Sequence, residues 1–64
     1  MKKPFRVWHQ ENGLSVSFEL DAENVRHAQK LFAMRHARLN WAVPDVLWVE
    51  ELVDGKWKVI WSKI

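Results

Sequence analysis

Histidines and carboxylates are the residues with which this chain could do chemistry, and their spacing argues against a catalytic site. His27 and His36 lie nine residues apart, so a helix would place them on opposite sides and they could not share a metal ion. Glu50 and Glu51 are adjacent, so on a strand they would point to opposite faces and could not form a carboxylate pair. No serine lies in the glycine pattern of a nucleophile elbow. The absence of cysteine excludes a thiol nucleophile and most structural zinc sites. We therefore expect no catalytic residue, no metal and no cofactor.

Both glycines fall in sequences that predict tight turns. Asn12-Gly13 and Asp54-Gly55 each join two β-rich runs, and a type I′ turn needs positive φ at both central residues. The pattern predicts one hairpin over residues 5–11 and 14–20 and a second over residues 46–53 and 56–62. Because both glycines are used in turns, none remains for a phosphate-binding loop.

The first hairpin has one apolar face and one polar face. The apolar face carries Phe5, Val7, Leu14, Val16, Phe18 and Leu20. The other face is polar apart from Trp8. This alternation is typical of a sheet that a helix covers on one side only.

The second hairpin is apolar on both faces, so the alternation of polar and apolar residues does not decide which face packs against the helix. One face carries Val46, Trp48, Leu52, Trp57, Val59 and Trp61, with Glu50 as its only charge. The other carries Leu47, Val49 and Ile60, together with Lys56, Ser62 and a Glu51–Lys58 cross-strand pair. We assign the tryptophan-rich face to the core, which would let Glu50 pair with Arg35 or His36. The two-residue loop predicts a register in which Val49 faces Ile60 and Trp48 faces Trp61.

Between the hairpins, the sequence predicts a helix from about residue 22 to residue 39. Asp21 is the expected N-cap, and Pro44 keeps the helix from restarting. The expected core stripe consists of Val25, Ala28, Phe32 and Leu39. His36 is expected half-buried beside this stripe, and Trp41 is expected to cover one end of the core.

The element order is therefore ββαββ, and the predicted fold is α+β, a single domain over residues 1–64. One helix packs on one face of a four-stranded antiparallel sheet. The preferred strand order is 2-1-3-4, and the alternative is 1-2-3-4 with a parallel central pair. A chain this short buries about 60% of its unfolded surface, so it needs a dense core or a partner.

Net charge and hydropathy indicate a cytoplasmic protein. The formal net charge is +2, a mild basic excess. No apolar run approaches the roughly 20 residues that span a bilayer, and no apolar run follows the first lysines as in a secretory signal. We expect a soluble protein without membrane contact.

Two surfaces are candidates for binding a partner. On the open sheet face, an apolar stripe beside charged residues would mark a contact site. On the outer face of the helix, a basic surface could meet an acidic protein or phosphates, although such a surface is commonly just solvated. The predicted partner-binding residues are Arg6, Trp8, Val49, Lys58 and Ile60 on the sheet and Arg26, Lys30 and Arg38 on the helix. The open face could equally bind a second copy of the chain.

The helix AENVRHAQKLFAMRHA followed by the hairpin VEELVDGKW resembles small phage-encoded accessory proteins, including some anti-CRISPR proteins. This resemblance covers roughly the last two-thirds of the chain and is one of pattern, so it implies no residue roles. It implies a stoichiometric inhibitor or adaptor that acts on a larger host protein or ribonucleoprotein complex. The alternative is a nucleic-acid-binding domain in which Trp8 stacks on bases and nearby basic residues contact phosphates.

Overall fold

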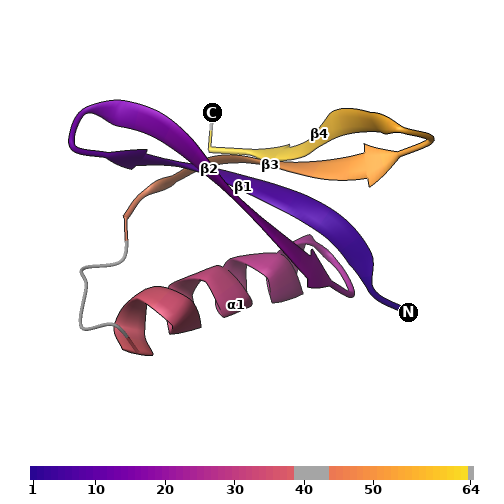
Figure 1. The fold of residues 1–64 in the computed structure, drawn as a ribbon, viewed down its shortest axis with the longest axis horizontal. Coiled ribbons are helices and arrows are strands. Elements are labelled where there is room, and N and C mark those ends of the chain that lie inside the picture. The colour runs from indigo at the N-terminus through magenta and orange to yellow at the C-terminus, as the bar shows by residue number, and fades with distance from the viewer. Residues whose placement is uncertain (39–43, 64) are drawn as a thin grey trace.

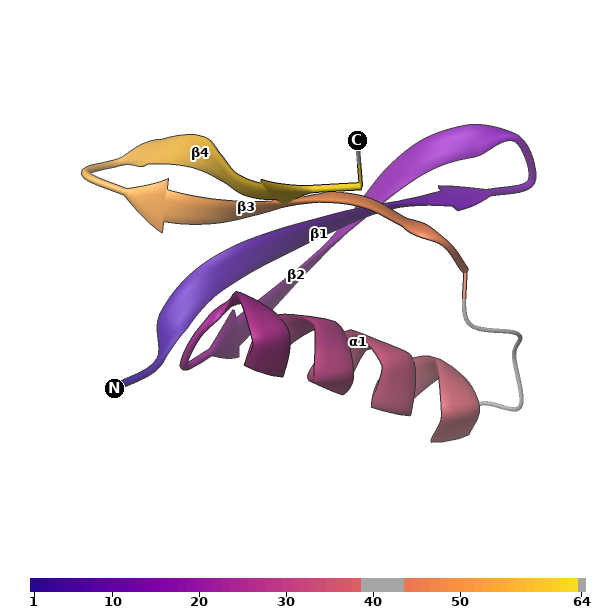
Figure 2. The same cartoon turned by 180° about the vertical axis from the view of Figure 1, so that it is seen from behind.

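The structure is a computed structural model that describes residues 1–38 and 44–63. In chain order, its elements are β1 (Lys3–Glu11), β2 (Leu14–Ala22), α1 (Val25–Arg38), β3 (Val46–Val53) and β4 (Lys56–Ser62). The two views of the ribbon show a twisted sheet with the helix lying across one of its sides (Figures 1 and 2). The described helix does not have the length and apolarity that crossing a bilayer requires.

The four strands form one sheet in the order β2-β1-β3-β4, and every neighbouring pair is antiparallel. This confirms the predicted ββαββ fold and the preferred strand order, and it rules out the alternative with a parallel central pair. Because β1 and β3 are the central strands, they bring the N-terminal and C-terminal hairpins side by side.

The first hairpin has the predicted turn and register. Asn12 and Gly13 have φ angles of 53° and 79°, as a type I′ turn requires. Phe5 pairs with Leu20 and Val7 pairs with Phe18, as predicted. The second turn has the same form, with φ angles of 52° and 78° at Asp54 and Gly55.

The helix begins later than predicted, and its cap is Asn24 rather than Asp21. The side-chain Oδ1 of Asn24 accepts a hydrogen bond of 2.8 Å from the backbone N–H of His27, which is the N-cap geometry. Strand β2 continues to Ala22, which is fully buried, so Asp21 belongs to the strand. Burial of the Ala22 methyl group explains why the chain stays extended for two residues beyond the predicted strand end. The predicted roles of Leu39 and Trp41 lie outside the described residues.

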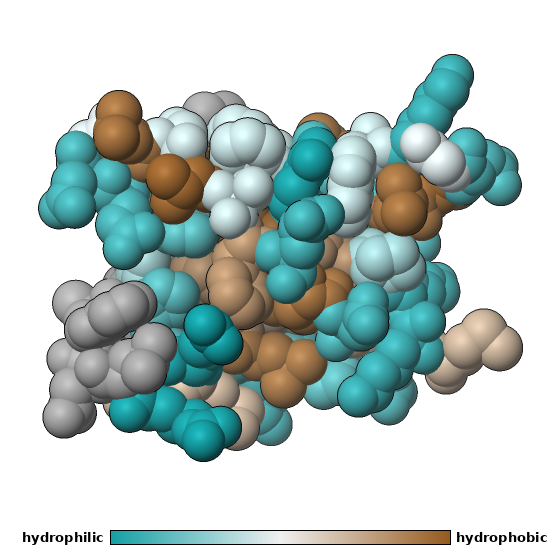
Figure 3. Space-filling view, in the orientation of Figure 1, coloured by the Kyte–Doolittle hydropathy of each residue, from teal (hydrophilic) through white to brown (hydrophobic). Residues whose placement is uncertain are grey.

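The core lies between the sheet and the helix. Its buried apolar members are Phe5, Val7, Ala22, Ala28, Phe32 and Val49. Figure 3 shows hydrophobic side chains in the gap between the two layers, with hydrophilic residues around them. Complete burial of a Phe side chain contributes about 1.5–3 kcal/mol, so Phe5 and Phe32 are major sources of stability.

The second hairpin has the opposite orientation to the one predicted. Val49 is fully buried in the core and pairs with Val7, whereas Trp48 pairs with Trp8 on the other face. The tryptophan-rich face therefore lies on the side of the sheet away from the helix, apart from Trp61, which pairs with Val49 and lies on the helix side. The physical reason is volume, because one short helix lying over β1 and β2 leaves room for a Val side chain from β3 but not for a row of indoles.

A β-bulge also shifts the register of the second hairpin. The predicted pairs hold from Val53–Lys56 to Glu50–Val59, but Val49 then pairs with Trp61 instead of Ile60. Ile60 is the additional residue on β4. A bulge of this kind increases local twist and interrupts regular pairing at a sheet edge.

Candidate binding surface on the open sheet face

The face of the sheet opposite the helix gathers five side chains from three strands. They are Arg6, Trp8, Trp48, Glu50 and Trp57, and we call them the tryptophan cluster. The register explains their position, because cross-strand partners share a face and Trp8 pairs with Trp48 while Arg6 pairs with Glu50. Trp57 joins them from β4. In the described part of the chain, no helix or strand packs on this face (Figures 1 and 2).

Glu50 is the polar centre of the tryptophan cluster. Arg6 Nε donates a hydrogen bond of 2.6 Å to Glu50 Oε1, and Trp8 Nε1 donates one of 2.5 Å to the same oxygen. The side chains of Arg6 and Glu50 are 25% and 14% exposed, so this ion pair is shielded from water on most sides. A charge-assisted hydrogen bond in such a site is stronger than one at an open surface.

Aromatic contacts fix the rings around this ion pair. Trp8 and Trp48 stack with their ring centroids 5.2 Å apart and their planes 22° apart. The Arg6 guanidinium carbon lies 4.4 Å from the ring centroid of Trp57 and 5.4 Å from that of Trp8. Both distances are within the range of cation–π attraction. Arg6 therefore lies against two indoles while it is hydrogen-bonded to Glu50.

The electrostatics of Glu50 follow from these contacts. Burial by itself raises the pKa of the Glu50 carboxyl, but hydrogen bonds from Arg6 and Trp8 and the positive charge of Arg6 together outweigh burial. A hydrogen bond from Trp48 acts in the same direction, so the pKa lies below its ordinary value. Glu50 is ionised at neutral pH and is already used as an acceptor. The predicted pairing of Glu50 with Arg35 or His36 is wrong, because Glu50 faces away from the helix.

The structure separates the predicted residues of the open face. Arg6 and Trp8 belong to the tryptophan cluster. Val49 does not reach the surface, because it fills the core beneath the helix. Lys58 pairs with Glu51, which in turn pairs with buried Phe5, so Lys58 lies on the helix side of the sheet instead of the open face. Ile60 is exposed at the bulge on edge strand β4.

Sequence reasoning missed three members of the tryptophan cluster: Trp48, Glu50 and Trp57. Glu50 was the available signal, since a charge is out of place on a core face. With the strand order 2-1-3-4, Arg6 on β1 is the basic residue that could reach Glu50 across the sheet. Such a pair of opposite charges would have identified the open face.

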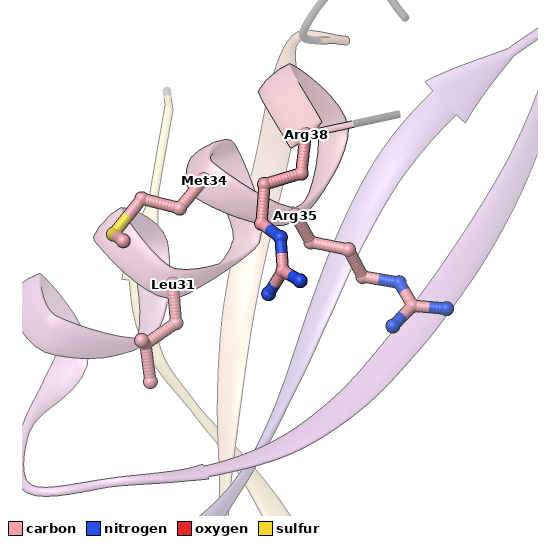
Figure 4. A pocket seen from close by; sticks show the side chains of 4 residues that line it. All are labelled: Leu31, Met34, Arg35 and Arg38. Atoms are coloured by element: carbon pink, nitrogen blue, oxygen red, sulfur yellow. The ribbon is translucent and has the colours of Figure 1, made fainter. Parts of the chain in front are cut away.

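The predicted basic residues on the helix, Arg26, Lys30 and Arg38, are exposed. Arg38 also lines a pocket with Leu31, Met34 and Arg35, in which the two arginine side chains extend from the last helical turn (Figure 4). The guanidinium carbon of Arg35 lies 4.8 Å from the ring centroid of Phe18, so this side chain covers the edge of the core. Its cation–π contact gives Arg35 a structural role.

The buried histidines also have structural contacts. His9 and His36 both pack on Phe32, with ring centroids 4.7 Å and 4.4 Å from that of Phe32. His36 Nδ1 lies 3.0 Å from the carbonyl oxygen of Phe32. Among residues 1–38 and 44–63, no group of three or more His, Asp or Glu residues could hold a metal ion.

Comparison with protein-family models, with curated proteins and with solved structures gives no match for this chain. The resemblance to phage accessory proteins therefore stays a prediction. The function has to be argued from the geometry of the tryptophan cluster.

Proposed function

We propose that this chain is a non-enzymatic protein-binding module that contacts its partner through the tryptophan cluster. The observation that carries the proposal is the collection of three indoles, one arginine and one carboxylate on the sheet face opposite the helix. Trp and Arg are enriched among the residues that dominate binding energy at protein interfaces. Partly exposed aromatic side chains on an open sheet face provide such an anchor.

The contacts within the cluster support binding with little loss of side-chain freedom. Trp8 and Trp48 are stacked, and Arg6 is held between Glu50 and Trp57. Ordering a flexible side chain at an interface costs about 0.5–1.5 kcal/mol, and this surface is ordered before the partner arrives. A preorganised surface is suited to a stoichiometric inhibitor or adaptor.

The charges favour a protein partner over nucleic acid. Glu50 neutralises Arg6 at short range, and β2 adds Glu19 and Asp21 on the same face. A phosphate would have to displace Glu50 from Arg6 and would meet carboxylates nearby. The sequence resemblance adds the proposal that the partner is a larger host protein or ribonucleoprotein complex.

Capture of partners from host lysate tests the proposal. The tagged wild-type chain is compared with Trp8→Ala in the cluster and with Met34→Ala, which truncates an exposed apolar side chain on the helix, away from the cluster and from β4. We expect a single stoichiometric protein that survives nuclease and salt and is lost only with Trp8→Ala. Thermal unfolding of all three proteins shows whether the variants remain folded.

Other outcomes would assign a different role. Recovery that disappears on nuclease treatment and falls steeply with salt would support the nucleic-acid alternative. A folded Trp8→Ala variant that captures the partner as well as the wild type would show that the tryptophan cluster is not the binding surface. A dimer of the purified chain that Trp8→Ala dissociates would show that the face binds a second copy.

A further inference from the structure

Strand β4 has an unpaired backbone edge that is open to a further strand. It lies at one end of the sheet, and in the described part of the chain no strand pairs with its outer side. In a type I′ turn, the residue before the turn accepts a hydrogen bond from the residue after it, so Lys56 points its backbone N–H toward β3. Hydrogen-bonding direction alternates along an antiparallel strand, and Trp57 and Val59 therefore point their N–H and C=O groups outward.

The side chains of β4 are of two kinds, because Lys56 and Lys58 are charges of the sort that protect an edge, whereas the residues that follow them are apolar. Val59, Ile60 and Trp61 are consecutive and are 52%, 39% and 37% exposed. Edge strands usually carry polar residues, because an apolar edge promotes pairing with other chains. Val59, Ile60 and Trp61 depart from this rule, so a segment that also neutralises the two lysines could pair with this edge.

The two faces of the edge differ in chemistry. Lys56 and Lys58 lie on the helix side of the sheet, because they pair with Val53 and Glu51. Neither lysine has a carboxylate oxygen within 4 Å among the described residues. Trp57 and Val59 lie on the open face, where Trp57 is part of the tryptophan cluster. A strand added beside β4 would meet basic residues on one face and apolar residues on the other.

We propose that β4 accepts an extended segment of the protein partner in which acidic and apolar residues alternate. The acidic side chains would lie beside Lys56 and Lys58, and the apolar side chains would lie beside Trp57 and Val59. Backbone hydrogen bonds from Trp57 and Val59 would supply affinity, as in other cases of strand addition. This inference rests on the proposed protein-binding function and names the chemistry of the partner.

The charge of the edge argues against a second copy as the occupant. Strand β4 and the residue after it contain Lys56, Lys58 and Lys63 and no acidic residue. Pairing β4 with itself would bring lysines close together, whereas an acidic segment would neutralise them. The bulge at Ile60 limits regular pairing to residues 56–59, so the bound segment is short.

The probe for this inference is a fluorescently labelled peptide of alternating Glu and Val, about six residues long, which is the typical length of a strand. Its control has the same composition with the Glu and Val residues in separate blocks. Val59→Pro removes an outward N–H, and proline is tolerated where that group faces solvent. Val59→Ala is the matched control, because it shortens the side chain and keeps the N–H. We expect the alternating peptide to bind the wild type, to bind Val59→Ala slightly more weakly because the apolar contact is smaller, and to bind Val59→Pro about tenfold more weakly than Val59→Ala.

Charge reversal gives an independent test in case Val59→Pro does not fold. The double variant Lys56→Glu, Lys58→Glu should lose the Glu–Val peptide and gain a Lys–Val peptide of the same length. Equal binding of alternating and block peptides, or equal affinity of Val59→Pro and Val59→Ala, would overturn the inference. Peptide-independent dimerisation that Val59→Pro abolishes would overturn it in favour of a second copy.

Lysate capture with the same variants separates this inference from the proposed function. If Val59→Pro retains the partner and Trp8→Ala loses it, the edge is not used and the tryptophan cluster remains the binding surface. If Trp8→Ala retains the partner and Val59→Pro loses it, the edge carries the binding and the proposed role of the cluster is wrong. If both variants remain folded and lose the partner, the added strand and the cluster bind it together.

Discussion

Replacing Glu50 by Gln is the most direct test of the tryptophan cluster. Glu50→Gln keeps the shape of the side chain and an oxygen that can accept from Trp8, but it removes the charge that faces Arg6. Hydrogen bonds to charged groups contribute about 1.5–3 kcal/mol, and the side chains of Arg6 and Glu50 are 25% and 14% exposed, which weakens the pair somewhat. We therefore expect Glu50→Gln to lower the free energy of unfolding by about 1–2 kcal/mol.

That loss is large for a chain of this size. A 64-residue domain has a total stability of about 3–10 kcal/mol, and 1 kcal/mol shifts the melting temperature of a small domain by about 4–8 °C. The melting temperature of Glu50→Gln should fall by about 5–15 °C. Urea unfolding followed by far-ultraviolet circular dichroism measures the free energy without depending on tryptophan emission.

The pH dependence of this difference has a definite sign. The pKa of Glu50 is lower in the folded chain than its ordinary value of 4.5, so its contribution is complete above that value. As pH falls through the folded pKa, the carboxyl becomes neutral and the contribution is lost. The difference in stability between wild type and Glu50→Gln should therefore be largest near neutral pH and shrink on acidification.

Glu51→Gln is the matched control, because it changes the neighbouring carboxylate on the opposite face. Glu51 Oε2 lies 3.9 Å from Lys3 Nζ, and the Lys3 side chain is 54% exposed, so we expect an effect of about 0.5 kcal/mol or less. Two results would refute the reasoning about Glu50. One is equal stability of Glu50→Gln and wild type at neutral pH, and the other is a difference that persists unchanged into strong acid.

Two further predictions test the corrected parts of the fold by urea unfolding. Asn24→Ala should lower the free energy of unfolding by about 1 kcal/mol, because it removes the N-cap acceptor, while Asp21→Ala should change it by about 0.5 kcal/mol or less. The reverse order of these two effects would restore Asp21 as the cap. Val49→Ala should cost about 2–3 kcal/mol, because it removes two buried methyl groups and leaves a cavity, while Val59→Ala at the exposed edge should cost about 0.5 kcal/mol or less. A larger loss at Val59 than at Val49 would show that the second hairpin has the opposite orientation.

The first hairpin was predictable because its two faces differ in polarity. Phe5, Val7 and Phe18 alternate with polar residues, and Asn12-Gly13 leaves a single register for the pairing. These features are local, and each is set by a turn or by a period of two. The strand order joins distant segments that no turn connects, so 2-1-3-4 was only the preferred order, and the structure excludes 1-2-3-4.

The second hairpin was not predictable in the same way, because hydrophobicity does not distinguish its faces. Choosing the face with more tryptophan assumes that the largest apolar side chains are buried in the core. Here the space beneath one helix is too small for a row of indoles. Val49 is therefore buried in the core, and Trp48 and Trp57 lie on the open face of the sheet. The bulge at Ile60 likewise depends on sheet twist, and no turn signal in the sequence marks it.

The remaining indole surface is stabilised by contacts within the cluster, and this constrains what can bind there. Trp8 and Trp48 cover each other, while Arg6 covers part of Trp57 and is neutralised by Glu50. A ligand that needs the charge of Arg6 must first break a short, shielded ion pair, which disfavours phosphates. A ligand that presents apolar groups can add to the rings and leave the ion pair intact. The proposed segment on β4 meets this condition, because its apolar side chains would lie beside Trp57 while its acidic side chains would lie on the opposite face with Lys56 and Lys58. The position of Glu50 thus favours a partner whose negative charge is kept on the helix side of the sheet.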